Sequence, residues 1–224
     1  ADIFSAGDNF DFGLRIHTEK GTAHFTYFNN AYKGFISTEI VAFVSGHGGQ
    51  DSISQAINFS RVRIQGFEGF LERPLQLGRL VVTPWANFSF HQGQILEGTN
   101  PLSGEALDGT PQDNITPFKM MSGFRVMDSK QRYWMDYSNR IQTKVSRVAR
   151  TLSTSPFLIA QDLFSLYGFT VHRLGWGVNW NRESYRWGLS FALENLSNKF
   201  YREQFQFAPA RGRSLTMGVH LHKF

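Results

Sequence analysis

The sequence predicts an all-β protein, specifically a transmembrane antiparallel β-barrel, from the alternation of its side chains and from the lengths of its loops. Many segments alternate apolar with polar or small residues at period two, which places the two sets on opposite faces of a strand. The clearest case is Phe10, Phe12, Leu14 and Ile16, which alternate with Asp11, Gly13, Arg15 and His17. No apolar run approaches the roughly 18 residues of a transmembrane helix.

Composition agrees with such alternation. Charged residues make up 18% of the chain, below the roughly 25% of average soluble domains, and aromatic residues make up 15%. The absence of cysteine excludes a disulfide scaffold and any thiolate metal site. The net charge of +5 is spread singly among aromatic residues, so no nucleic-acid partner is expected.

Alternation predicts nine strands of the length that spans a bilayer at a tilt. These are residues 8–18, 22–34, 56–71, 78–93, 117–127, 131–143, 157–172, 185–196 and 213–224. Short turns are expected around 19–21, 73–76, 128–130 and 181–184, and long polar loops over 35–55, 94–116, 144–156 and 197–212. Outer-membrane barrels pair short periplasmic turns with long extracellular loops in this way.

Two features constrain this prediction. Pro84 lies inside a predicted strand, where it removes a ladder hydrogen bond, so a bulge is expected there. Nine strands are an odd number, whereas bacterial single-chain barrels have even numbers. The chain is therefore not expected to close on itself, and its first strand is expected to pair with a strand outside this sequence.

The last part of the chain carries a family resemblance. Residues 191–203 read FALENLSNKFYRE, residues 208–214 read APARGRS, and the final strand ends in Phe224. This order resembles the final hairpin of TonB-dependent receptors, in which an Asn-Leu, Asn and Tyr motif closes the penultimate strand and a Gly-Arg-Ser stretch opens the last one. Weaker similarities lie at residues 9–14, 64–68 and 115–117.

The resemblance implies a barrel of about 22 strands, plugged by a further domain. Residues 1–224 would be the C-terminal part of that barrel, without the plug. The implied function is import of a scarce nutrient, such as a ferric siderophore, across the bacterial outer membrane. The implied partners are the rest of the receptor, the TonB complex acting through the plug, outer-membrane lipid and lipopolysaccharide. No enzyme activity, catalytic residue, metal or cofactor is expected.

The motif residues also have a physical interpretation. Asn195 and Asn198 fall where a strand gives way to a loop, and asparagine tolerates the left-handed conformation and caps turns. Gly212 permits a tight entry into the last strand. Phe224 falls on the face of His220 and His222, so a local bulge or a frayed end is expected near the terminus.

Candidate ligand residues are few. One basic cluster runs from a strand end into a long loop and could attract an anionic ligand or lipopolysaccharide phosphates, but a solvated loop is the preferred interpretation; it comprises Arg140, Lys144, Arg147 and Arg150. His91 and His220 are candidates for the lumen wall. His220 and His222 share a face and would suit a metal pair, but a polar lumen wall is the preferred interpretation.

Alternation predicts which side chains of the last two strands face lipid and which face inward. Lipid-facing residues are expected to be Leu189, Phe191, Leu215, Met217 and Val219, and inward-facing residues Ser190, Glu194, Thr216 and His220.

Other classes of function remain open. A small self-contained barrel of eight or ten strands would act as a porin or adhesin, and a soluble β-sandwich would be a binding module. A membrane phospholipase lacks any visible Ser, His and Asn or Asp pairing. The glycine-rich residues 45–49 are not followed by a helix with lysine, as a phosphate-binding loop requires.

Overall fold

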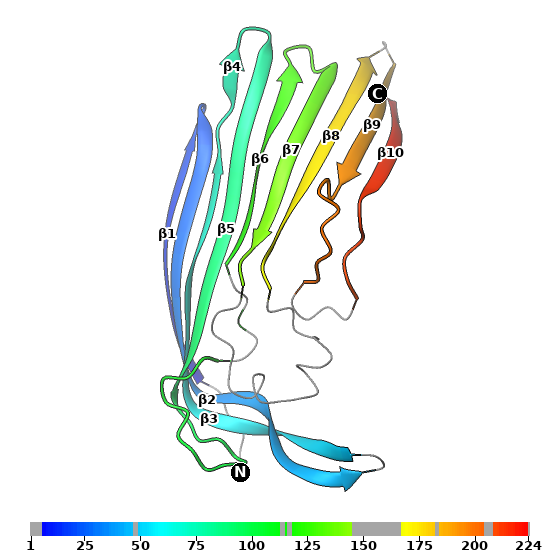
Figure 1. Ribbon diagram of the computed structural model, residues 1–224. Coiled ribbons are helices and arrows are strands. Elements are labelled where there is room, and N and C mark those ends of the chain that lie inside the picture. Colours follow the sequence, from blue (N-terminus) through cyan, green and yellow to red (C-terminus); the bar gives the residue numbers. More distant parts are fainter. Residues whose placement is uncertain are drawn as a thin grey trace.

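The computed structural model describes residues 6–46, 49–112, 115, 118–144, 167–181, 184–203 and 208–223. Within these residues ten strands form one antiparallel sheet, and the nine long strands lie side by side in chain order (Figure 1). The strands are β1 (Ala6–Thr18), β2 (Gly21–Gly46), β3 (Gly49–Glu72), β4 (Leu75–Leu77), β5 (Leu80–Glu97), β6 (Lys119–Asp128), β7 (Tyr133–Gln142), β8 (Phe169–Asn181), β9 (Tyr185–Glu194) and β10 (Ser214–Lys223).

Nine of these strands follow one path from β1 to β10, and the three-residue β4 pairs only with β5. Within the described residues the number of long strands is therefore the nine that were expected. β1 pairs with β2, β10 pairs with β9, and β1 and β10 do not pair with each other. They form the left and right margins of the curved sheet in Figure 1. The barrel is not closed by this chain.

The expected loop over 35–55 is wrong, because β2 and β3 continue through it as one long hairpin with a register shift between Ile40 and Ala42. Its arms are rich in β-branched and aromatic residues, which favour strands. Phe35 and Ile57 pack against a small buried cluster of Val62, Ile95 and Leu107. This cluster anchors the hairpin, which projects beyond the neighbouring strands at the bottom of Figure 1.

The expected strand at 157–172 is also displaced. Residues 145–166 lie outside the described part of the chain, and the described strand β8 runs from Phe169 to Asn181. Alternation is regular across β8, since His172, Leu174, Trp176 and Val178 share one face. Gly175 and Gly177 resemble turn residues in the sequence but lie within the strand.

Pro84 does not form a bulge. β5 pairs with β6 in unbroken register through Pro84, which lies opposite Phe124. On its other side β5 faces the interruption between β3 and β4, where the carbonyl of Pro84 accepts a hydrogen bond from the Arg73 amide at 3.1 Å. The missing N–H of proline therefore falls at a gap in the sheet, where it costs little.

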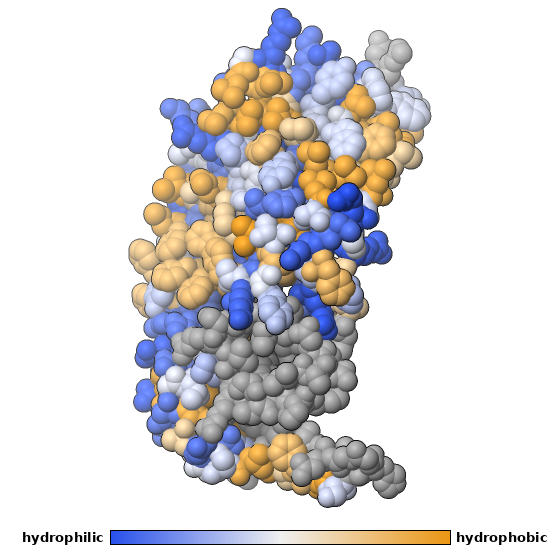
Figure 2. Space-filling view, viewed as in Figure 1, coloured by the Kyte–Doolittle hydropathy of each residue, from blue (hydrophilic) through white to orange (hydrophobic). Residues whose placement is uncertain are grey.

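The register divides the sheet into two faces. One side carries Phe12 on β1 and Val219 on β10, which are 61% and 66% exposed. We call this side the apolar face. Hydrophobic side chains gather along the left margin in Figure 2, beside β1 and its neighbours. We call the opposite side the polar face. On the nine long strands in order, it carries Arg15, His24, Glu68, Ser89, Lys119, Arg140, Arg173, Glu194 and Thr216.

The grouping of the last strands agrees with the expected one. Leu189, Phe191 and their partners on β10 share the apolar face, and Ser190, Glu194, Thr216 and His220 share the polar face. β10 pairs with β9 without a register shift from Ser214 to Lys223, so no bulge occurs there. Phe224 lies outside the described residues.

Candidate ligand site on the polar face

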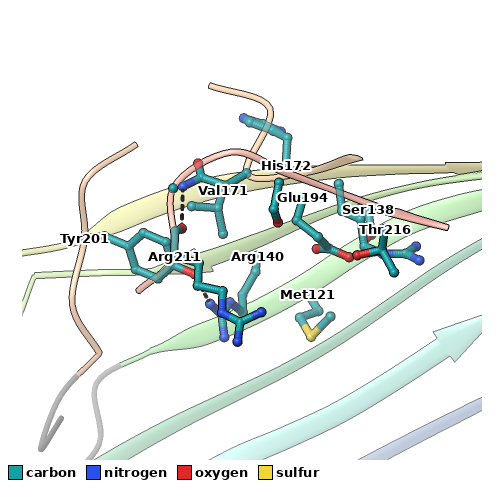
Figure 3. A pocket seen from close by; sticks show the side chains of 13 residues that line it. Met121, Ser138, Arg140, Val171, His172, Glu194, Tyr201, Arg211 and Thr216 are labelled. Carbon is teal, nitrogen blue, oxygen red and sulfur yellow. Dashed lines mark hydrogen bonds and ion pairs between the residues drawn. The ribbon is translucent and has the colours of Figure 1, made fainter. Parts of the chain in front are cut away.

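A cavity of about 440 Å³ opens on the polar face between β6 and β10. Its charged lining comes from four places in the chain, namely Arg140 on β7, Arg173 on β8, Glu194 on β9 and Arg211 in the segment that precedes β10 (Figure 3). Ser214 and Thr216 on β10 complete one wall. Because side chains of one parity share a face, antiparallel pairing brings these distant residues together.

Arg173 is held by two carboxylates. Its Nε donates to Glu194 Oε1 at 2.8 Å, and its Nη1 pairs with Asp136 on the adjacent strand β7. Asp136 is buried, and the small Gly175 beside it leaves room for the pair, since an added Cβ would lie 2.7 Å from Asp136 Oδ1. This network fixes the guanidinium of Arg173 within the sheet and leaves little freedom for it to reach a ligand.

Arg140 connects the sheet to the segment after β9. Its Nη1 donates to Glu203 Oε1 at 2.7 Å, and its Nη2 donates to Tyr201 Oη at 2.7 Å. The guanidinium also lies 5.4 Å from the ring centroid of Phe169 and 5.5 Å from that of Tyr201, within the range of cation–π attraction. The two rings are themselves in contact, with centroids 4.3 Å apart.

The segment between β9 and β10 is shaped by two asparagines. Asn195 and Asn198 both adopt a left-handed conformation with φ of 50°, which asparagine tolerates better than most residues. Asn195 Nδ2 donates to the carbonyls of Lys199 and Arg211 at 2.9 and 3.2 Å, and its Oδ1 accepts from the Lys199 amide. The role expected for both asparagines is confirmed.

Close packing explains why position 212 is a glycine. An added Cβ would lie 3.0 Å from Asn198 Oδ1, which accepts a hydrogen bond from the Arg213 amide at 2.9 Å. A side chain at position 212 would therefore crowd the Asn198 amide that holds the entry into β10. Together these contacts place Arg211 at the mouth of the cavity, and within the described residues no carboxylate pairs with its guanidinium.

The predicted site residues do not converge. Arg140 lines the cavity, whereas Arg147 and Arg150 lie outside the described residues. His91 lies elsewhere on the polar face, where its Nε2 is 3.3 Å from Glu68 Oε1 and its ring meets Phe28 edge-on at 5.3 Å. The ring of His220 lies against Gly188 on β9. The two histidines are therefore parts of the sheet surface and not of one site.

Five residues of this region were not predicted from the sequence as members of a site, namely Arg173, Asp136, Tyr201, Glu203 and Arg211. The parity of Arg173 and Asp136 places both on the polar face, which was a usable signal. Tyr201 and Glu203 are brought to Arg140 by the fold of residues 195–203, for which the sequence offers no spacing rule.

No group of three or more His, Cys, Asp or Glu residues within the described part of the chain is placed to hold a metal ion. His220 and His222 share the polar face, as expected from their spacing. The described residues also contain no helix long and apolar enough to cross a membrane.

Comparison with known proteins decides the family. Residues 6–204 match the model of the TonB-dependent receptor-like β-barrel. The chain belongs to this family. Members of the TonB-dependent receptor family are outer-membrane β-barrel proteins of Gram-negative bacteria, and the chain is accordingly an outer-membrane protein. A sequence comparison with the curated proteins found no match.

Solved TonB-dependent receptors share the fold. The copper transporter OprC superimposes with a TM-score of 0.72 at 19% identity, over 100% of this chain and 32% of OprC. The transporter YddB from Escherichia coli gives 0.62 at 14% identity, over 100% and 33%. The FrpB iron transporter from Neisseria meningitidis gives 0.62 at 17% identity, over 98% and 30%. The chain thus spans about a third of the length of these structures.

Proposed function

We propose that the chain forms part of the wall of a TonB-dependent receptor that imports a scarce nutrient, such as a metal ion or a ferric siderophore. The observation that carries the proposal is the family match over residues 6–204. Similar folds belong to a copper transporter, an iron transporter and a siderophore receptor from Acinetobacter baumannii. At 17 to 19% identity these structures support the class of cargo and do not select one cargo.

The proposed domain assignment is that residues 1–224 supply nine strands to a barrel of about 22, which is the strand number of outer-membrane transporters. In the part of the chain that the structure describes, β1 and β10 each present an unpaired edge, and an unpaired backbone group in hydrocarbon costs several kcal/mol. Strands outside this sequence would remove that cost by pairing with both edges. A plug domain and the TonB complex would then supply gating and energy.

The proposed role of the polar face is to line the lumen of that barrel. Charged side chains are tolerated there, whereas Arg or Lys at the bilayer midplane on the lipid side costs roughly 2–4 kcal/mol. Arg140 and Arg211 are the proposed ligand contacts, with His91, His220, Arg147 and Arg150 as further candidates. We propose no catalytic role for any residue of the chain.

The test uses the full-length receptor in its own outer membrane. Cells lacking the receptor should take up less of one radiolabelled iron or copper complex from a panel, and the receptor gene should restore uptake. Removing TonB, or collapsing the proton gradient, should abolish this receptor-dependent uptake. Uptake that persists without TonB would instead support the rival function, a passive porin-like barrel.

A further inference from the structure

A second cavity of about 370 Å³ lies beside Arg140 on the polar face and is not explained by the contacts described above. Three of its lining residues are directly opposite one another on neighbouring strands. Ser89 on β5 pairs with Lys119 on β6, and Lys119 pairs with Gln142 on β7. The Cβ atoms of residues paired in this way lie about 5 Å apart, and all three side chains line the same cavity.

The strongest observation is a buried donor without a partner. Gln142 is only 2% exposed, and among the residues that the structure describes its Nε2 has no hydrogen-bond acceptor. Buried polar groups are almost always hydrogen-bonded, because leaving one unsatisfied costs free energy. The side-chain amide carries two N–H donors, so an acceptor oxygen in the cavity would satisfy it.

Charge points to the same chemistry. Arg140 and Glu203 both line the cavity and pair with each other at 2.7 Å, so they cancel. Lys119 lines it too, and within the described residues no carboxylate forms an ion pair with Lys119. The cavity therefore carries one excess positive charge beside an unsatisfied N–H group, which favours an anionic acceptor.

We propose that this cavity is an oxyanion site, in which Lys119 and the side-chain amide of Gln142 together bind a carboxylate or a similar anionic oxygen. The inference rests on the proposed function, because it assumes that the polar face lines a lumen reached by ligand. The oxyanion belongs either to a soluble ligand or to an acidic side chain elsewhere in the receptor polypeptide. Lys119 supplies the positive charge, and the side-chain amide of Gln142 supplies a directional N–H donor.

The experiment measures binding of citrate, a soluble tricarboxylate, to the full-length receptor in detergent by calorimetry at low salt. The variants are Lys119→Gln and Gln142→Leu. The matched control is Lys130→Gln, which removes the same charge from the exposed turn at the opposite end of β6. Heat-modifiable migration on gels verifies that each variant is folded.

If the oxyanion belongs to a soluble ligand, the wild type should bind citrate. Either variant should then weaken citrate binding roughly tenfold or more, whereas the Lys130→Gln control should bind citrate as the wild type does. An internal acidic side chain predicts no citrate binding, but a thermal midpoint lowered by about 1–2 °C in both variants and unchanged in the control. The proposal is overturned if neither citrate binding nor the midpoint distinguishes the variants from the control. TonB-dependent uptake tests the proposed function separately, so the two failures are distinguishable.

Discussion

The indole ring of Trp134 on β7 lies against Gly177, its direct partner on β8, so closely that a Cβ at Gly177 would come within 2.6 Å of Trp134 Cε2. The guanidinium of Arg125 lies 5.8 Å above the same indole. A glycine inside a strand thus receives an aromatic side chain, and this contact explains why β8 tolerates a residue that strands disfavour.

Gly177→Val should therefore destabilise the folded barrel by roughly 1–3 kcal/mol, because the new side chain overpacks the Trp134 contact. The control is Gly13→Ala, since an added Cβ there meets nothing closer than Thr26 Oγ1 at 3.4 Å. Reversible urea unfolding of the receptor in detergent or lipid measures both. Equal stability of the two variants would mean that Trp134 does not require the glycine.

A second prediction concerns the two faces of β10. Met217→Arg should cost roughly 2–4 kcal/mol of folding free energy, because it places a charge among lipid chains. Thr216→Arg should cost little, because Thr216 lines the cavity on the polar face. Refolding titrations into lipid vesicles compare the two. Equal tolerance of arginine at both positions would contradict the assignment of the faces.

A third prediction concerns Asn195. Asn195→Ala should destabilise the 195–213 segment by roughly 1–3 kcal/mol, since it removes three hydrogen bonds and disfavours the left-handed backbone. Asn195→Gly keeps the backbone conformation and loses only the hydrogen bonds, so it should be milder. The measurement is the rate of limited proteolysis in this segment. The prediction fails if the alanine variant is cut as slowly as the wild type.

A fourth prediction concerns the turn that joins β6 to β7. The Asp128 carboxylate accepts hydrogen bonds from the Tyr133 amide at 2.9 Å and from Arg132 Nε at 3.1 Å. The hydrogen bond from the Tyr133 amide is the main cause that holds the pKa of the Asp128 carboxyl below its usual value, and Arg132 lowers that pKa further. A lowered pKa stabilises the folded turn above about pH 3.9, and this contribution is lost as the pH falls through the folded pKa.

Hydrogen exchange of the Tyr133 amide should therefore accelerate as the pH falls below about 3.9, after correction for the intrinsic rate. In Asp128→Asn the corrected rate should be higher and independent of pH in this range. A wild-type profile that is equally flat would show that the carboxylate does not support the turn.

Much of the fold could be predicted because period two is a local property. Phe12 and Val219 reveal their shared face within their own strands, and the number of long strands follows from such segments. Where local signals conflict with tertiary contacts, prediction failed. The strand over 157–172 was placed too early, and the glycines Gly175 and Gly177 find their place in β8 only through their contacts with Asp136 and Trp134. Pro84 is harmless only because the partner strand is interrupted opposite it.

The candidate site was harder to predict for the same reason. Arg140 stood out as part of a basic cluster, but its partners Tyr201 and Glu203 lie about 60 residues away, at separations of 61 and 63. Only the left-handed turns at Asn195 and Asn198 bring them back to the sheet. The unsatisfied amide of Gln142 is a property of packing, and residue type alone does not predict it.

The central claim is that this sheet is an open section of a larger barrel, and paired cysteines test it most directly, because the chain contains no native cysteine. In the full-length folded receptor, Gly13→Cys with Thr26→Cys joins register partners on β1 and β2 and serves as the positive control. Gly13→Cys is then combined in turn with a cysteine at Thr216, Gly218 or His220 on β10, and oxidation is followed on gels. The account predicts a disulfide in the control and none between β1 and β10. An efficient β1–β10 disulfide would mean that the nine long strands close on themselves, which would contradict the account.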